Sequence, residues 1–159
     1  MIRLYAFFVA CACLLATVAA AEERYAGYYY PEITSTEDYT RLIRSAPPAA
    51  KAVRVEFVTN LTLAQLAAPE SPRFVFFAKG SDSRHLIVVA LDDEVFSTLF
   101  RARAVMAQMT SNLRQNDFLQ VSDLRFLATF YDLLQLMQFD TLVLSDGKSW
   151  SHQVNLIRE

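Results

Sequence analysis

The sequence predicts an α+β fold, in which a mostly antiparallel sheet of about five to six strands is covered by three to four helices in a single domain. Short runs of aromatic and β-branched residues with polar ends occur over 73–91 and again over 141–157. Between them, residues 101–115 and 122–139 repeat apolar side chains at helical spacing. We find no internal repeat, low-complexity tract or linker that would divide this region.

The first 21 residues have the pattern of a secretory signal peptide. Arg3 gives a positive start, an apolar run covers 4–18, and the small residues Ala19, Ala20 and Ala21 follow. A membrane anchor needs about 20 apolar residues, more than this run provides. A lipoprotein would begin at one of the two cysteines, yet the apolar run continues past both. We therefore expect cleavage after Ala21, no integral membrane span afterwards, and a periplasmic or secreted protein.

Cleavage would divide the chain into a signal peptide (1–21), an N-terminal aromatic arm (22–35) and one α+β domain (36–159). The mature chain would contain no cysteine, so core burial rather than disulfides would hold the domain together. Its formal net charge of −2 would become −3 on removal of Arg3. A mildly acidic chain gives no general electrostatic reason to bind nucleic acid or an anionic membrane.

The aromatic arm is rich in tyrosine, with Tyr25, Tyr28, Tyr29 and Tyr30 close together. Such a segment offers a large contact area at low cost in side-chain entropy. Two interpretations remain open: the arm contacts a partner, or it packs on its own sheet.

Helices and strands are expected to alternate after the arm. Ser35 and Thr36, followed by two acids, indicate a helix that starts there and ends near Arg44. Alternating apolar residues then predict a strand over 53–59, and Asn60 is expected to cap a short helix. Further along we expect strands at 73–80 and 85–91, with 95–100 compatible with another, and helices at 101–115 and 122–139, the latter capped by Ser122.

The stretch LSDGKSWSH (144–152) brings serine, aspartate, lysine and histidine together, but we interpret it as a hairpin turn. Asp-Gly between two strand-like runs favours a two-residue type I′ turn, which would pair Thr141 with His152. Ser145 and His152 would then lie roughly 13 Å apart along the ladder. A nucleophile and its base need hydrogen-bond contact of about 3 Å, so this stretch is not predicted to be catalytic.

Two candidate ligand contacts lie at strand positions. His152 falls on the apolar face of the last strand beside Trp150, where it is either a buried histidine with one partner or a pocket residue. Lys79 ends a strand just before Gly80, where it either meets an anion or simply marks the strand exit.

Two more candidates, Arg101 and Arg103, begin a predicted helix. Cations at this end oppose the helix macrodipole, so a compensating partner is expected. They either pair with the acidic residues at 92–94 or face an anionic ligand together with Arg114.

The composition argues against metal and cofactor sites. The mature chain would offer only two histidines and no thiolate, whereas structural zinc needs four Cys or His ligands and catalytic zinc three protein ligands. The acidic run at 92–94 lacks the spaced oxygen ligands of an EF-hand. Only three glycines occur, too far apart for a phosphate-binding loop. We therefore expect neither a metal nor a cofactor.

Four segments, YYYPEITSTEDY, FFAKG, LFRARAVMAQMT and LVLSDGKSWSHQV, together resemble a family of small exported bacterial proteins, and the resemblance covers nearly the whole mature chain. Some members of that family carry the name molybdopterin-guanine dinucleotide biosynthesis protein A. An enzyme of that kind is similar to nucleotidyltransferases, whose Gly-rich N-terminal loop holds an arginine and a lysine around the nucleotide. This sequence has a signal peptide at that place and no such loop downstream, so no catalytic residue carries over.

The leading hypothesis is an exported, non-catalytic binding or accessory domain of the cell envelope. Its partner would be another envelope protein or a small ligand, and a homodimer is compatible with the sequence. The competing hypothesis is a small-molecule-binding protein or enzyme with a pocket around His152 and Lys79. A third, molybdopterin-guanine dinucleotide biosynthesis, rests on the resemblance by name alone.

Overall fold

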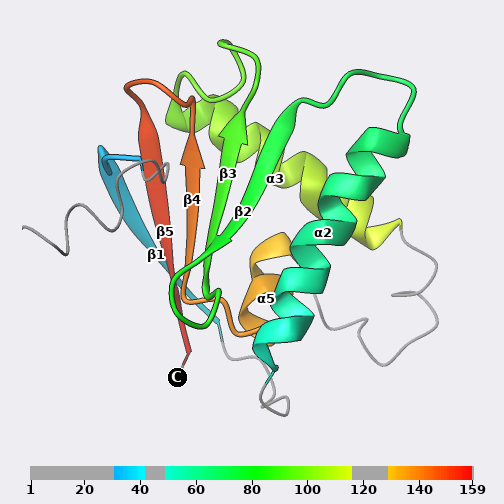
Figure 1. Ribbon diagram of the computed structural model, residues 1–159. Coiled ribbons are helices and arrows are strands. Elements are labelled where there is room, and N and C mark those ends of the chain that lie inside the picture. Colours follow the sequence, from blue (N-terminus) through cyan, green and yellow to red (C-terminus); the bar gives the residue numbers. More distant parts are fainter. Residues whose placement is uncertain (1–30, 42–48, 116–128, 159) are drawn as a thin grey trace, which may run out of the picture. The chain divides into compact units, whose positions relative to one another are not determined.

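The computed structural model describes residues 31–41, 49–115 and 129–158, and the account below concerns these residues. The predicted signal peptide, the four tyrosines of the arm and the predicted cap Ser122 lie outside them. No helix in the described ranges is long and apolar enough to span a membrane. Figure 1 shows the elements in chain order: β1 (Ser35–Thr40), α2 (Lys51–Ala67), β2 (Phe74–Lys79), β3 (His85–Ala90), α3 (Leu99–Arg114), α5 (Phe130–Leu136), β4 (Thr141–Ser145) and β5 (Ser151–Ile157).

The five strands within the described ranges form one mixed sheet in the order β1-β5-β4-β3-β2. The β2–β3 and β4–β5 pairs are antiparallel, whereas β1 with β5 and β3 with β4 are parallel. An α+β domain is therefore confirmed, but the prediction of a mostly antiparallel sheet is wrong. Parallel pairing needs a long connection between strands. Here the chain provides one between β3 and β4, which includes α3 and α5, and another between β1 and β5.

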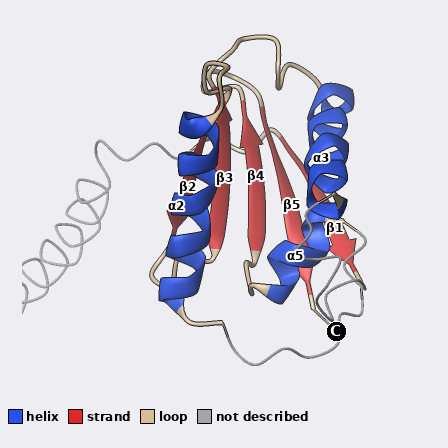
Figure 2. Ribbon diagram, turned by 90° about the vertical axis from the view of Figure 1, so that its right-hand side faces the viewer, coloured by secondary structure: helices blue, strands red, loops and turns tan. Residues whose placement is uncertain are grey.

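The three helices of the described residues lie on one face of the sheet (Figure 2). Successive side chains of a strand point to opposite faces, so every second strand residue contributes to the layer under the helices. The buried residues of this layer form a single cluster that draws on strands and helices alike: Val58, Phe76, Leu86, Val88, Ala90, Val95, Phe96, Ala102, Met106, Phe130, Leu134, Phe139, Leu142, Leu144, Val154 and Leu156.

Residues 35–40 form β1 and not the predicted helix start. Tertiary contacts override the local capping signal, because the segment pairs in register with β5. The strand is also fixed at its end, where the Tyr39 hydroxyl donates to Asp132 Oδ1 at 2.7 Å and Arg41 pairs with the same carboxylate. Alternation appears in the exposure of the strand, since Glu37 and Tyr39 are half-buried and their neighbours exposed.

Residues 53–59 belong to α2, so the prediction of a strand there is wrong. The alternating Val53 and Val55 are exposed, while the residues that α2 buries are Arg54 and Val58, four positions apart. That spacing is the helical one. Asn60, predicted to cap a separate short helix, lies within α2, which runs without Gly or Pro to Ala67.

The later elements agree better with prediction. β2, β3 and α3 match the expected ranges to within two residues, but 95–100 is a turn followed by the start of α3. Thr98 caps α3 by accepting the Arg101 N–H at 3.3 Å. Thr129 caps α5 through a reciprocal capping box with Asp132.

The predicted β4–β5 hairpin is present, but its loop is longer than two residues and its register differs. Leu144 pairs with His152, and Ser145 with Ser151. Asp146 Oδ1 accepts the backbone N–H groups of Lys148, Ser149 and Trp150 at 2.8, 3.0 and 2.9 Å. This aspartate-centred turn accommodates the extra residues, with Gly147 at φ +75°.

Candidate functional site

His152 lies on the helix-facing side of β5 and is 2% exposed. The Trp150 ring stacks against it, with ring centroids 6.2 Å apart and an interplanar angle of 23°. Its Nδ1 is 2.8 Å from the Ser35 Oγ, and its Nε2 is 3.4 Å from Glu37 Oε1 without forming a hydrogen bond. Both partners belong to β1. Parallel pairing places Ser35 opposite His152, and Glu37 is two residues further along β1 on the same face of the sheet.

Glu37 connects this histidine to α3. Its Oε2 accepts from Arg103 Nη2 at 2.6 Å. Burial raises the pKa of Glu37, but the hydrogen bond and charge of Arg103, together with the nearby His152, outweigh burial, so the pKa lies below its ordinary value. Glu37 is therefore ionised at neutral pH. We call Ser35, His152, Glu37 and Arg103 the His152 cluster.

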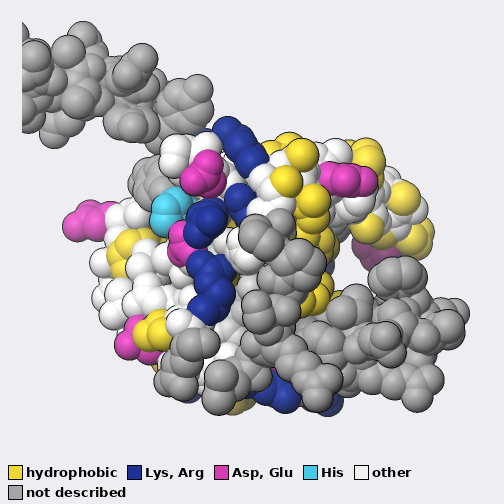
Figure 3. All heavy atoms as spheres, turned by 90° about the horizontal axis from the view of Figure 1, so that it is seen from below, with side chains coloured by type: hydrophobic (Ala, Val, Ile, Leu, Met, Phe, Trp, Pro, Cys, Tyr) yellow, Lys and Arg dark blue, Asp and Glu magenta, His cyan; other side chains and the backbone are white. Residues whose placement is uncertain are grey.

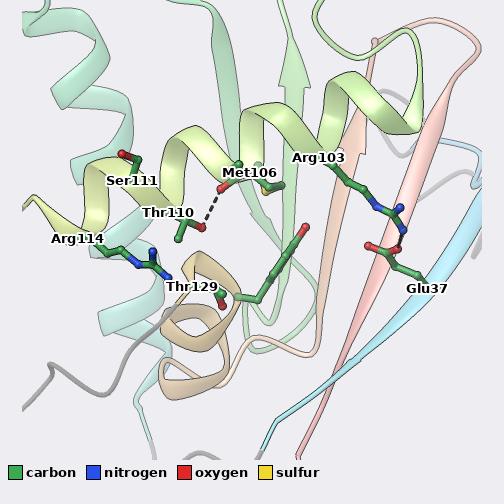
Figure 4. A pocket seen from close by; sticks show the side chains of 9 residues that line it. Glu37, Arg103, Met106, Thr110, Ser111, Arg114 and Thr129 are labelled. Carbon is green, nitrogen blue, oxygen red and sulfur yellow. Dashed lines mark hydrogen bonds and ion pairs between the residues drawn. The ribbon is translucent and has the colours of Figure 1, made fainter.

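A cavity of about 480 Å³ adjoins the His152 cluster, with Glu37 and Arg103 in its wall. The rest of the wall comes from one face of α3 and from the start of α5: Met106, Ala107, Thr110, Ser111, Arg114, Thr129 and Tyr131. In Figure 4, Arg103 points toward Glu37, while Arg114 reaches toward Thr129 from further along α3.

The sequence builds this wall through helical spacing. The α3 residues that line the cavity recur at intervals of three and four positions between Arg103 and Arg114, so they share one side of the helix. The Thr110 hydroxyl donates to the Met106 carbonyl at 2.9 Å (Figure 4) and accepts the Phe130 N–H at 3.1 Å. That second bond joins α3 to the start of α5.

The cavity wall combines charged side chains with one neutral phenol. Burial, and then the charge of Glu37, raises the pKa of Tyr131 to about 12, so its phenol stays neutral and can donate a hydrogen bond at physiological pH. Glu37 carries the negative charge of the wall, whereas Arg103 and Arg114 carry two positive charges.

A second, more polar cavity of about 340 Å³ lies at the end of the sheet where β3 and β4 begin. Figure 3 views the domain from this end and shows Lys and Arg side chains in a row beside a histidine. Asp82, Arg84, His85 and Asp140 are in the cavity wall. Asp140 pairs with Arg84 at 3.6 Å and also with Arg158, so acids offset the cations here.

The four predicted ligand contacts do not come together. Lys79 ends β2, three strands from β5 and on the opposite face of the sheet from His152, with its Nζ 5.3 Å from the centroid of the Phe77 ring. Arg101 donates to the Glu94 carbonyl at 2.6 Å and lies 3.4 Å from its carboxylate, so it pairs with the acidic turn as one interpretation expected. Arg103 and His152, by contrast, are joined through Glu37.

Sequence reasoning missed Ser35, Glu37 and Tyr131. The first two were read as a helix start, which hid their common face on a strand. Residues 35–40 contain one aromatic side chain, Tyr39, among polar ones, so they carry no apolar alternation that would have indicated the strand. Ser145 and His152 do not form a catalytic pair, as expected, but the reason differs from the predicted one. Ser145 is opposite Ser151, so its side chain points to the other face of the sheet from His152.

Within the described ranges, no group of three or more His, Cys, Asp or Glu side chains is placed to hold a metal ion. The chain matches no family model, no curated protein and no solved structure. Any functional conclusion therefore depends on the geometry of the site.

Proposed function

We propose that this chain is an exported binding domain that holds a small organic anion in the cavity between α3, β1 and the start of α5. The observation that carries this proposal is a cavity of about 480 Å³ whose wall contains two arginines and one carboxylate. That volume is in the range of small-molecule sites, about 300–1,000 Å³. The signal-peptide pattern of the first 21 residues supports export to the cell envelope.

The wall offers different contacts to the two ends of such a ligand. A guanidinium presents a planar set of N–H donors that matches a carboxylate or sulfonate, and Arg114 stands at the end of the cavity away from the Glu37–Arg103 pair. Met106 and Ala107 give apolar contact for the remainder of the ligand. The neutral Tyr131 phenol adds a donor that does not change with pH near neutrality.

The test uses 1-anilinonaphthalene-8-sulfonate, an aromatic anion whose fluorescence rises in apolar sites, as the probe. We expect one probe per chain, and Arg114→Met should raise its Kd at least tenfold, which corresponds to about 1.4 kcal/mol. Arg101→Met is the matched control, because Arg101 is on the same helix but pairs with Glu94 outside the cavity. Equal effects of the two changes, or none from Arg114→Met, would contradict the proposal.

Native mass spectrometry of the full chain purified from its own host would identify the natural ligand. The expected result is a retained molecule of a few hundred daltons that an excess of the probe displaces. A ligand that the probe cannot displace would place binding elsewhere on the domain.

A further inference from the structure

The Ser35 side chain is exposed, yet its hydroxyl makes a close contact with a buried base. Its Oγ lies 2.8 Å from His152 Nδ1, within the range of about 2.6–3.2 Å that a nucleophile and its general base require. The Trp150 ring stacks on the face of the imidazole. The serine is therefore reachable from solvent, while its base is fixed in orientation.

The surroundings of His152 favour the tautomer that activates Ser35. Glu37 Oε1 is the carboxylate oxygen next to Nε2, at 3.4 Å, so a proton is favoured on Nε2 and the Nδ1 lone pair faces the serine. Arg103 holds the other oxygen of Glu37 at 2.6 Å and keeps the carboxylate charged. In the familiar Ser-His-Asp arrangement Nε2 faces the serine. Here the two nitrogens exchange roles, with Nδ1 facing the serine and Nε2 facing the carboxylate. One ring nitrogen still faces the nucleophile and the other faces the carboxylate.

We propose that Ser35 is a nucleophile for acyl transfer from carboxylic esters, with His152 as its general base and Glu37 as a positioning residue. Ser35 Oγ forms a bond to the ester carbonyl carbon as its proton passes to His152 Nδ1. The ester C–O bond then breaks, and the departing alkoxide takes that proton from the imidazolium. Water repeats the sequence on the acyl-serine, which releases the carboxylic acid and restores Ser35.

The edge position of β1 supplies a donor for the developing oxyanion. Thr34 N–H points toward β5, where it bonds to the Ser151 carbonyl at 3.2 Å, and alternate residues of a strand point their N–H groups to opposite sides. The Ser35 N–H therefore points away from β5, and β1 has no strand on that side within the described sheet. A backbone N–H beside the nucleophile is the type of group that stabilises a tetrahedral intermediate.

This activity does not depend on the anion proposed for the cavity, because Ser35 is not in the cavity wall. A failure of probe binding at Arg114 and a failure of Ser35 reactivity would therefore be separate results. Glu37 and Arg103 are common to both sites, so neither is used to distinguish them.

The test is reaction of the full chain with a fluorophosphonate, in which the serine oxygen displaces fluoride from phosphorus and its proton passes to the base. We expect a single adduct by intact mass, mapped to Ser35, and no adduct in Ser35→Ala. His152→Gln should slow labelling at least a hundredfold, in line with the usual contribution of a general base. Ser149→Ala, which changes an exposed serine of the β4–β5 loop, should label at the wild-type rate.

Glu37→Gln tests the positioning role through the pH dependence of labelling. Among the described residues, Glu37 of β1 is the charged group next to His152, at 3.4 Å from Nε2, and Arg103 of α3 pairs with that carboxylate. Loss of the carboxylate should shift the rising limb of the labelling rate to lower pH, since the imidazolium loses its counter-charge, and should lower the plateau rate. Labelling at other serines only, or equal labelling of Ser35 in His152→Gln with circular dichroism unchanged, would overturn the proposal.

Discussion

Arg54 and His152 are both 2% exposed, yet they are buried in different ways. The Arg54 guanidinium donates to three backbone carbonyls: Asp82 at 2.8 and 3.1 Å, Ala49 at 2.8 Å and Met137 at 3.3 Å. It makes no ion pair with a carboxylate of the described residues. His152 instead has side-chain partners, one of them exposed, and its Nε2 makes no hydrogen bond in the described structure.

The hydrogen-bond partners of Arg54 and His152 indicate a different role for each side chain. The carbonyls around Arg54 come from the second residue before α2, the β2–β3 turn and the residue after α5, so one side chain joins three parts of the chain. A buried polar group satisfied by backbone is a structural element. The partners of His152 instead reach solvent at Ser35 and the cavity at Glu37. Burial of polar groups alone therefore does not mark a functional site; the identity of their partners does.

The largest effect is expected from Arg54→Met. The substitution keeps an unbranched apolar stem but leaves buried carbonyls without donors, and each such loss costs about 1–3 kcal/mol. We expect the free energy of unfolding, measured by urea denaturation at pH 7, to fall by about 3 kcal/mol or more.

Lys51→Met is the matched control for Arg54. Lys51 also binds the β2–β3 turn, where its Nζ donates to the Ser81 carbonyl at 2.8 Å, but this bond is exposed. Water can replace an exposed donor, so the cost should stay below about 1 kcal/mol. Similar decreases in the free energy of unfolding for the two variants would show that burial does not increase the contribution of Arg54 to stability.

A smaller effect, tied to pH, is expected at Tyr131 beside the His152 cluster. Its pKa is raised to about 12 from 10.0, chiefly by burial. A raised folded pKa gives stability that is complete below the unfolded pKa and is lost as pH rises toward the folded one. Between pH 9 and pH 11 the wild type should therefore lose about 1 kcal/mol more than Tyr131→Phe, as measured by urea unfolding. Parallel losses in the two proteins would mean that the phenol ionises normally.

The same contrast shows how much the sequence could predict. Strand and helix periods located β2, β3, α3 and the hairpin, because each of these elements has a periodic apolar face. Residues 35–38 carry a local helix-start signal that pairing with β5 overrides, and no local pattern encodes a partner more than 100 residues away. Arg54 falls inside an alternating Val-x-Val-x-Phe run that imitates a strand. His152 was recognised as unusual, but its partners Ser35 and Glu37 follow only from the register of β1.

The smallest effect on stability is expected from His152→Leu, although the residue is as buried as Arg54. Its one side-chain hydrogen bond among the described residues is with Ser35, whose exposed hydroxyl can bond to water instead, and a typical hydrogen bond contributes only about 1 kcal/mol net. Leucine has a similar volume and keeps apolar contact with Trp150, so we expect a loss of about 1 kcal/mol or less by urea denaturation at pH 7. A loss as large as that of Arg54→Met would make His152 a structural residue and remove the basis for assigning it a chemical role. A stable variant whose Ser35 no longer reacts would separate stability from reactivity at one buried position.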